Sequence, residues 1–279
     1  MSRRPFFLLS LALVSAGAAL AVWLAAFVVP GVRTLDAGAM LGFKGAAPPR
    51  LEPSIHGVAV LANPTPFVVG GVLLVALALL RRRLLMAAIV PAILLGANVT
   101  TQVLKPALAD PRTIDMGGVA SIYAGSWPSG HSTAAMSLAL CFVLVVGPRL
   151  RPLAAVLGAG YAIAVGYALV ALGAHLPSDV LGGYLVAATF TLLGAGALAA
   201  LEARDPVRAA RVRPPAILSP PALTAAVAAL LACAGALVVV HAPGLTLSAL
   251  QHPTAIAAGA GIAALGLMLT AGLAVVLRR

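Results

Sequence analysis

The stretch Trp127-Pro128-Ser129-Gly130-His131-Ser132-Thr133 decides how this chain is interpreted. It stands directly before an apolar run, and its Pro-Ser pair predicts a helix start with Ser129 as the N-cap. Gly130 allows a backbone to approach a ligand closely, and free N–H groups at a helix N-terminus attract anions. His131 adds a titratable group beside them. The stretch therefore predicts a phosphate pocket with a proton donor, against the alternative of an ordinary capped helix.

The composition is that of a membrane protein. Of the 279 residues, 62% are hydrophobic and only 9% are charged, and the mean hydropathy is +1.08. A soluble domain of this length does not need so much apolar surface. The net charge of +11 does not indicate nucleic-acid binding, because the basic residues form short clusters between apolar runs. Cys141 and Cys233 both lie inside apolar runs, with neither metal-ligand nor disulfide spacing.

The apolar runs predict an all-α fold, a polytopic membrane helix bundle of about eight transmembrane helices. The first run is long for a signal peptide, so we interpret it as a retained span. We expect residues 1–200 to form a six-span core with a Gly/Pro-rich outer loop at 30–63, and residues 201–279 to add two C-terminal spans. The expected spans are residues 6–29, 64–80, 84–104, 129–147, 153–173, 178–200, 220–240 and 254–277.

The basic clusters orient these spans. If the N-terminus is cytoplasmic, 13 of the 18 Lys and Arg fall on the cytoplasmic side, as the positive-inside rule requires. Both termini are then cytoplasmic, and the loops carrying Lys105, His131 and His175 share the extracytoplasmic face. That convergence was not used to choose the spans, so it supports a common site.

Two further polar segments accompany the opening stretch. Lys105 and Arg112 stand seven positions apart near the membrane and could clamp a phosphate, although interfacial snorkelling explains them as well. His175 and Asp179 stand four positions apart, a spacing that places side chains on one helical face. A carboxylate that orients a histidine fixes its tautomer and raises its basicity. The alternative for Asp179 is helix capping, which leaves His175 unexplained.

Taken together, the three segments resemble the three motifs of the type 2 phosphatidic acid phosphatase superfamily, which includes lipid phosphatases, bacterial acid phosphatases and vanadium haloperoxidases. The first motif, Lys, six residues, Arg-Pro, has its spacing here, with Thr113 in place of the proline. Residues 128–131 match the second motif, Pro-Ser-Gly-His, in full. His175 and Asp179 match the end of the third, within His-Leu-Pro-Ser-Asp-Val-Leu-Gly-Gly. The resemblance covers roughly residues 30–200.

The resemblance implies a role for each matching residue. His175 would be the nucleophile that forms a phosphohistidine, Asp179 would orient it, and His131 would be the general acid. No cofactor and no metal are implied. The residues implied to bind the substrate phosphate are Lys105, Arg112, Ser129 and Gly130.

One position departs from the family pattern. The third motif places Ser-Arg shortly before its histidine, whereas this chain has Ala168 and Leu169. In relatives that arginine helps to hold the phosphate oxygens, and one preorganised donor is often worth roughly two orders of magnitude in rate. Arg112, Lys105 or Arg33 are candidates to compensate.

The sequence thus predicts an enzyme of the bacterial cell membrane that hydrolyses a lipid phosphate or pyrophosphate at the extracytoplasmic face. Candidate substrates are polyprenyl pyrophosphate, phosphatidic acid and phosphatidylglycerol phosphate, with the lipid bilayer as partner and no nucleic acid. A phosphotransferase would use the same residues. A lipid-binding or carrier-like protein that lost turnover is the second hypothesis, and an unrelated transporter the third. Nothing in the sequence fixes the oligomeric state.

Overall fold

The computed structural model describes residues 4–109, 125–204 and 252–278, and all regular structure within them is helical. This confirms the all-α prediction. The α-helices are α1 (Arg4–Val28), α2 (Pro30–Ala46), α3 (Glu52–Val60), α4 (Pro64–Leu80), α5 (Leu84–Ala107), α6 (Gly130–Val145), α7 (Arg151–Ala171), α8 (Pro177–Arg204) and α12 (Pro253–Val276), with a short 3-10 turn, η1, at Pro49–Leu51.

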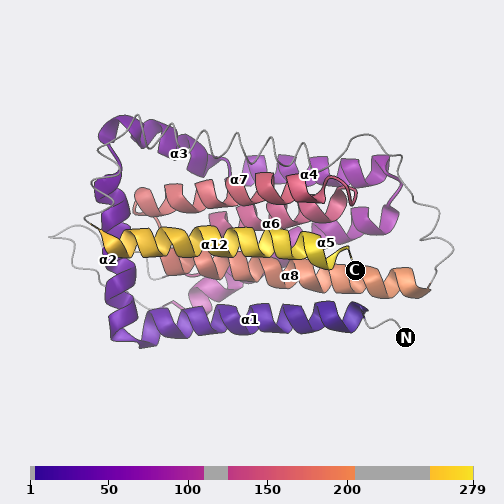
Figure 1. Cartoon of the computed structure of the whole chain (residues 1–279), viewed down its shortest axis with the longest axis horizontal. Coiled ribbons are helices and arrows are strands. Elements are labelled where there is room, and N and C mark those ends of the chain that lie inside the picture. Colours follow the sequence, from indigo (N-terminus) through magenta and orange to yellow (C-terminus); the bar gives the residue numbers. More distant parts are fainter. Residues whose placement is uncertain (1–3, 110–124, 205–251, 279) are drawn as a thin grey trace.

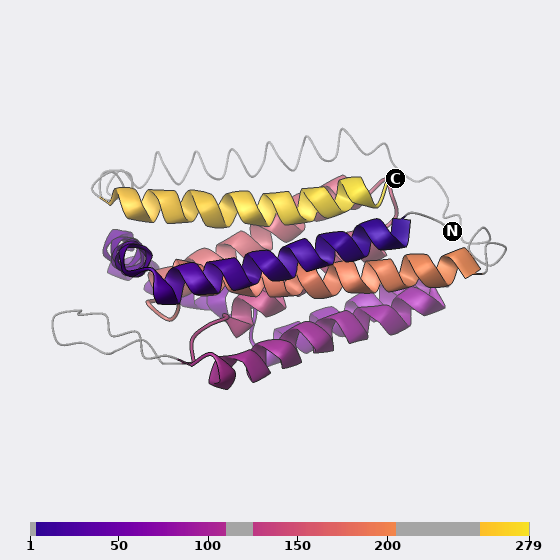
Figure 2. The same ribbon diagram turned by 90° about the horizontal axis from the view of Figure 1, so that it is seen from below.

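Most helices run side by side along the long axis, and α2 crosses one end of the bundle almost perpendicular to them (Figure 1). Seen from below, α2 is viewed nearly end-on, which agrees with that crossing (Figure 2). The first and last described residues lie at the opposite end from α2 (Figure 1). At their end, Arg4 and Arg151 both donate hydrogen bonds to the Leu277 carbonyl, at 3.3 and 2.8 Å. The bundle therefore has an end with several arginines and an end crossed by α2.

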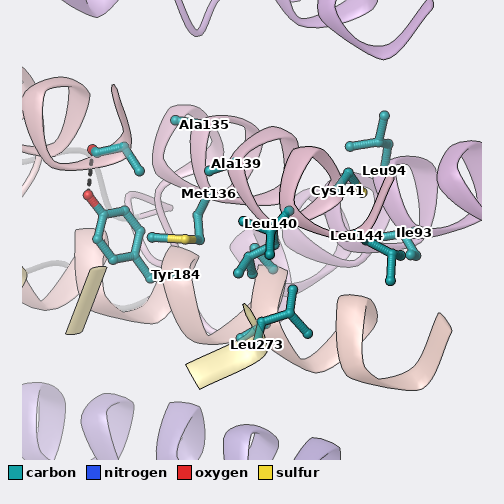
Figure 3. Close-up of a cluster of buried hydrophobic side chains, with 14 of the residues drawn as sticks. Ile93, Leu94, Ala135, Met136, Ala139, Leu140, Cys141, Leu144, Tyr184 and Leu273 are labelled. Carbon is teal, nitrogen blue, oxygen red and sulfur yellow. Dashed lines mark hydrogen bonds between the residues drawn. The ribbon is translucent and has the colours of Figure 1, made fainter. Parts of the chain in front are cut away.

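Helix α6 lies at the centre of the core. Twelve of its 16 residues are buried, and it packs against α4, α5, α7, α8 and α12. Figure 3 shows Met136, Leu140 and Leu144 of α6 among side chains from α5, α8 and α12. Tyr184 of α8 is fully buried and donates its hydroxyl hydrogen bond to the Ala162 carbonyl of α7. Cys141 is also buried there.

Seven of the eight expected spans coincide with helices. Five of these helices, α1, α5, α7, α8 and α12, are long and apolar enough to cross a membrane. Helices α3 and α4 together form a sixth candidate, bent by 46° at the break between them, and α6 is apolar but shorter. The expected span at 220–240 lies outside the described residues, as does Cys233.

The prediction of a loop at residues 30–63 is wrong, because this segment is mostly helical. Its prolines indicated a loop, yet α2, η1, α3 and the following α4 each carry proline in the first turn. The backbone N–H groups of the first turn have no acceptor within the helix, so proline loses no hydrogen bond there, and its fixed φ suits a helix start. These prolines therefore mark helix starts.

Helix α12 packs on the predicted core, against α7 and α2 above all. Tyr167 of α7 donates a 2.7 Å hydrogen bond to the Gly259 carbonyl of α12. A Cβ on Gly42 of α2 would lie 2.8 Å from both the His252 and the Ala255 Cβ atoms. Helix α12 thus contacts the helix that crosses the end of the bundle. The division into domains at residue 200 stays a prediction.

Candidate active site

The start of α6 is built as the sequence predicts. Ser129 is the N-cap, and its hydroxyl accepts a hydrogen bond from the Ser132 N–H at 3.3 Å. The Thr133 hydroxyl donates to the Ser129 carbonyl at 2.9 Å and lies 3.1 Å from the Thr101 hydroxyl of α5. These bonds hold the first turn of α6 against α5. The N-terminal amides of α6 are consequently fixed in place, which is the arrangement that an anion site requires.

His175 and Asp179 form a pair at the start of α8. The His175 Nδ1 lies 3.3 Å from the Asp179 Oδ2, and the Asp179 carboxylate is fully buried. The same Oδ2 accepts the Leu176 N–H at 3.1 Å. An ionised carboxylate accepts hydrogen bonds only, so ionised Asp179 requires the proton of the neutral His175 ring on Nδ1. The Nε2 of His175 is then left with a free lone pair.

Segments far apart in the sequence meet at the junction of α6 and α8. The Ser129 N–H donates to the Asp179 carbonyl at 2.9 Å, which joins the second motif directly to the third. Two glycines of α8 permit this approach. A Cβ on Gly182 would lie 2.5 Å from the Trp127 Nε1, and one on Gly183 would lie 2.7 Å from the Ser129 carbonyl oxygen. The Gly-Gly pair after Asp179 therefore allows the two motifs to touch.

Lys105 and His131 face the same junction. The point where a Cβ would sit on Gly130 lies 3.7 Å from the Lys105 Nζ. Lys105 is close enough to Asp179 for the two groups to interact electrostatically. His131 is similarly close to His175 and Lys105. The structure thus brings six of the seven predicted site residues to one end of the bundle. Arg112 lies outside the described residues.

Three residues that the sequence did not single out also reach this region. Asp36 of α2 is buried and accepts hydrogen bonds from the Ser178 N–H, at 3.0 Å, and from the Ser178 hydroxyl. Asn63, between α3 and α4, places its Oδ1 2.9 Å from the His131 Nε2. Lys44 of α2 lies beside Gly173, whose missing Cβ would be 3.9 Å from the Lys44 Nζ. All three come from residues 30–63, where the sequence had predicted a loop without a readable role.

Leu169, at the position of the missing arginine, is part of the core. Its side chain is only 3% exposed, and its carbonyl accepts the Ala174 N–H at 3.0 Å where α7 ends. Gly173 follows with a positive φ of 68°, which glycine adopts without strain. Lys44 is consequently a described cation beside the turn that leads into His175.

Within the described parts of the chain, no three His, Cys, Asp or Glu side chains gather as a metal-ligand set. The polar groups named above at this end are instead two histidines, two carboxylates, two ammonium groups and the amides at two helix starts. That set suits an anion and proton transfer.

Comparison with known proteins agrees with the motifs. The family model described as the PAP2 superfamily matches residues 84–203. Residues 84–203 are therefore similar to this superfamily. They extend from α5 to α8 and include all three motifs that resemble those of the superfamily.

Among solved structures, the chain resembles the "first transmembrane PAP2 type phosphatidylglycerolphosphate phosphatase from Bacillus subtilis". The two chains are 20% identical with a TM-score of 0.54, and the match covers 72% of this chain and 98% of the other. At this identity the likeness shows the fold, that of a membrane PAP2-type phosphatase. No curated protein matches the chain.

Proposed function

We propose that this chain is an integral membrane phosphatase that hydrolyses a lipid phosphate or pyrophosphate through a phosphohistidine. The observation that carries the proposal is the His175–Asp179 pair, hydrogen-bonded at 3.3 Å and joined to the Ser129 amide by the Asp179 carbonyl. A nucleophile and its orienting carboxylate thus stand beside a helix N-terminus suited to phosphate.

The first step is attack of the His175 Nε2 on phosphorus. Asp179 keeps the proton on Nδ1, so the lone pair is on Nε2, and the buried carboxylate stabilises the positive charge that the ring gains. As the nitrogen–phosphorus bond forms, the bond from phosphorus to the leaving oxygen breaks. His131, protonated, gives its proton to that oxygen as general acid.

The second step returns the enzyme to its starting state. Neutral His131 takes a proton from water as the water oxygen attacks the phosphohistidine. The nitrogen–phosphorus bond breaks, its electron pair returns to the His175 Nε2, and inorganic phosphate leaves. A phosphotransferase would follow the same steps with an alcohol or phosphate acceptor in place of water.

Positive groups and backbone amides would hold the phosphate. Lys105, Arg112, Ser129 and the Gly130 amide are the groups proposed from the family motifs. We add Lys44, because it lies beside Gly173 in the turn before His175. It would supply positive charge from α2, whereas relatives supply it from the residue equivalent to the buried Leu169.

The proposed location follows from the two ends of the bundle. The site is at the end crossed by α2, and the arginines near both termini are at the other end. Since positive clusters favour the cytoplasmic side, the site would face the extracytoplasmic side of the cell membrane. There it suits an amphiphile whose phosphate lies in the headgroup zone, such as polyprenyl pyrophosphate, phosphatidic acid or phosphatidylglycerol phosphate.

The test is phosphate release by the purified protein in detergent, measured for these lipids with EDTA present. We expect release from at least one lipid, with trapping of a phosphohistidine after acid-free quenching. His175→Ala should abolish both signals. Full activity of the folded His175→Ala protein would overturn the mechanism, and loss of activity in EDTA would contradict its independence of metal.

A second candidate function has one observation in its favour. Leu169 is buried where relatives carry a phosphate-binding arginine, which would suit a protein that binds lipid phosphates without turnover. Saturable binding of phosphatidic acid, with no phosphate release from any lipid tested, would favour this candidate over the phosphatase.

A further inference from the structure

We infer that Asn63 is a positioning residue for the general acid His131, fixing the imidazole so that Nδ1 faces the leaving group. The inference rests on the proposed function for its chemistry and on a 2.9 Å contact between the Asn63 Oδ1 and the His131 Nε2 for its geometry. Asn63 precedes the family match at residues 84–203, so it is an addition to the three motifs.

Asn63 occupies the break between α3 and α4, where the chain bends by 46°. A broken helix inside a membrane protein is tolerated where its freed polar groups face protein or a cavity. Here the break lies beside the first turn of α6. It thereby places an amide side chain against the histidine of the second motif.

Ordinary helix capping does not account for this side chain. Asn63 is the N-cap of α4, yet its side chain makes no capping hydrogen bond. An N-cap side chain normally accepts from the N–H of the second or third helical residue. The third helical residue is Pro66, which has no N–H, and Pro64 removes the first. With fewer local donors to satisfy, the Asn63 oxygen accepts instead from His131.

The direction of this bond determines the tautomer. An amide oxygen only accepts, so the His131 Nε2 must carry a hydrogen in both the neutral and the protonated ring. The proton that is gained and lost in each cycle is therefore the one on Nδ1. Lys105 and His175 are near enough to His131 to affect it electrostatically, and both belong to the site. Asn63 would thus present Nδ1 to the leaving oxygen and later to the water.

Kinetics with two leaving groups test this role. A lipid phosphate leaves as an alkoxide and needs the acid, whereas p-nitrophenyl phosphate has a good leaving group and needs it far less. We expect Asn63→Ala to lower kcat for phosphatidic acid by roughly 10- to 100-fold, the value of one hydrogen bond to a charged group. For p-nitrophenyl phosphate the loss should stay below about threefold. Asn63→Asp, which keeps an acceptor oxygen, should recover most of the activity.

Two controls separate positioning from folding. Asn98→Ala removes the other asparagine of the chain, whose side chain donates to the Leu94 carbonyl of its own helix, and it should leave both rates unchanged. In a His131→Ala background, Asn63→Ala should cause no further loss, because the two residues act as a unit. Equal losses on both substrates, or a full additional loss in the His131→Ala background, would overturn the inference.

A spectroscopic test does not depend on turnover. The chain has five histidines, so nitrogen NMR of protein labelled at histidine gives few signals, and His131→Ala identifies the one that belongs to position 131. At a pH where the His131 ring has lost its second proton, we expect the remaining hydrogen on Nε2, and a mixture of tautomers in Asn63→Ala. An unchanged tautomer would refute the role of Asn63 even if the enzyme is active. Absence of phosphate release together with the expected tautomer change would count against the proposed function alone.

Discussion

Replacing Gly183 by alanine tests whether direct packing of α8 on the start of α6 sets the geometry of the site. The added Cβ would lie 2.7 Å from the Ser129 carbonyl oxygen and 3.0 Å from both the Thr133 nitrogen and the Ser132 Cβ. Two of these three atoms belong to backbone, which cannot rotate away as the end of a side chain can. The first turn of α6 must therefore move.

The size of the movement follows from ordinary contact distances. Normal contacts of a Cβ begin at 3.4 Å, so the Ser129 carbonyl must retreat by roughly 0.7 Å, a form of overpacking that typically costs about 1–3 kcal/mol. The same shift carries His131 away from His175 and Asp179. A misplacement of about 1 Å can cost roughly 100-fold in rate, so we expect a loss of that order in kcat/KM.

The assay is phosphate release from a lipid phosphate, with thermal unfolding in detergent measured in parallel. Gly261→Ala is the matched control, because its Cβ would meet no atom of the described residues within 4 Å. That variant should keep full activity and be unchanged or slightly more stable, since alanine is the better helix former. If Gly183→Ala is as active as Gly261→Ala, the contact between the motifs does not set the catalytic geometry.

Three further substitutions address the surrounding groups. Asp179→Asn should lower kcat by roughly 1,000- to 10,000-fold while the protein stays folded, because a neutral amide no longer fixes the tautomer of His175 or stabilises the positive charge on its ring. A loss in phosphate release below about tenfold would contradict the assignment of His175 as the nucleophile. Asp36→Ala removes the acceptor of two hydrogen bonds from Ser178 and should lower the free energy of unfolding by about 1–3 kcal/mol. Thermal unfolding should then have a lower midpoint, and an unchanged midpoint would show that this contact does not stabilise α2. Lys44→Ala should raise KM by about two- to fivefold with little change in kcat, a modest effect because the Lys44 side chain is exposed. Lys44→Arg should preserve KM, and an equal KM for the wild type and Lys44→Ala would show that Lys44 does not bind the phosphate.

Much of the fold was predictable because a long apolar run in a membrane protein forms a transmembrane helix. The run expected at 153–173, for example, is α7 at Arg151–Ala171. Residues 30–63 were not predictable in the same way, because glycine and proline are treated as signals for a loop. In the structure the prolines occupy first turns, and Gly42 lies against α12. Sequence alone does not distinguish a glycine that ends a helix from one that lets a neighbouring helix pack closely against it.

Some contacts in the site could likewise be predicted from the sequence, and others could not. The His175–Asp179 contact follows from a spacing of four residues, which a helix converts into proximity. The contacts of Asp36 with Ser178 and of Asn63 with His131 join residues 142 and 68 positions apart. No periodicity links such pairs, so only the fold brings them together. The missing arginine was visible at Leu169, but its burial in the core was not.

The contact between Gly42 and α12 has a consequence for how proteins with this fold vary. No residue larger than glycine fits at position 42 while His252 and Ala255 stand against it. In a PAP2 relative that ends after the helix equivalent to α8, nothing would occupy that face of α2. Position 42 should then accept alanine or larger residues in such relatives and stay glycine where a C-terminal helix follows. An alignment sorted by the presence of that helix would reveal this covariation, and glycine at position 42 in both groups would contradict it.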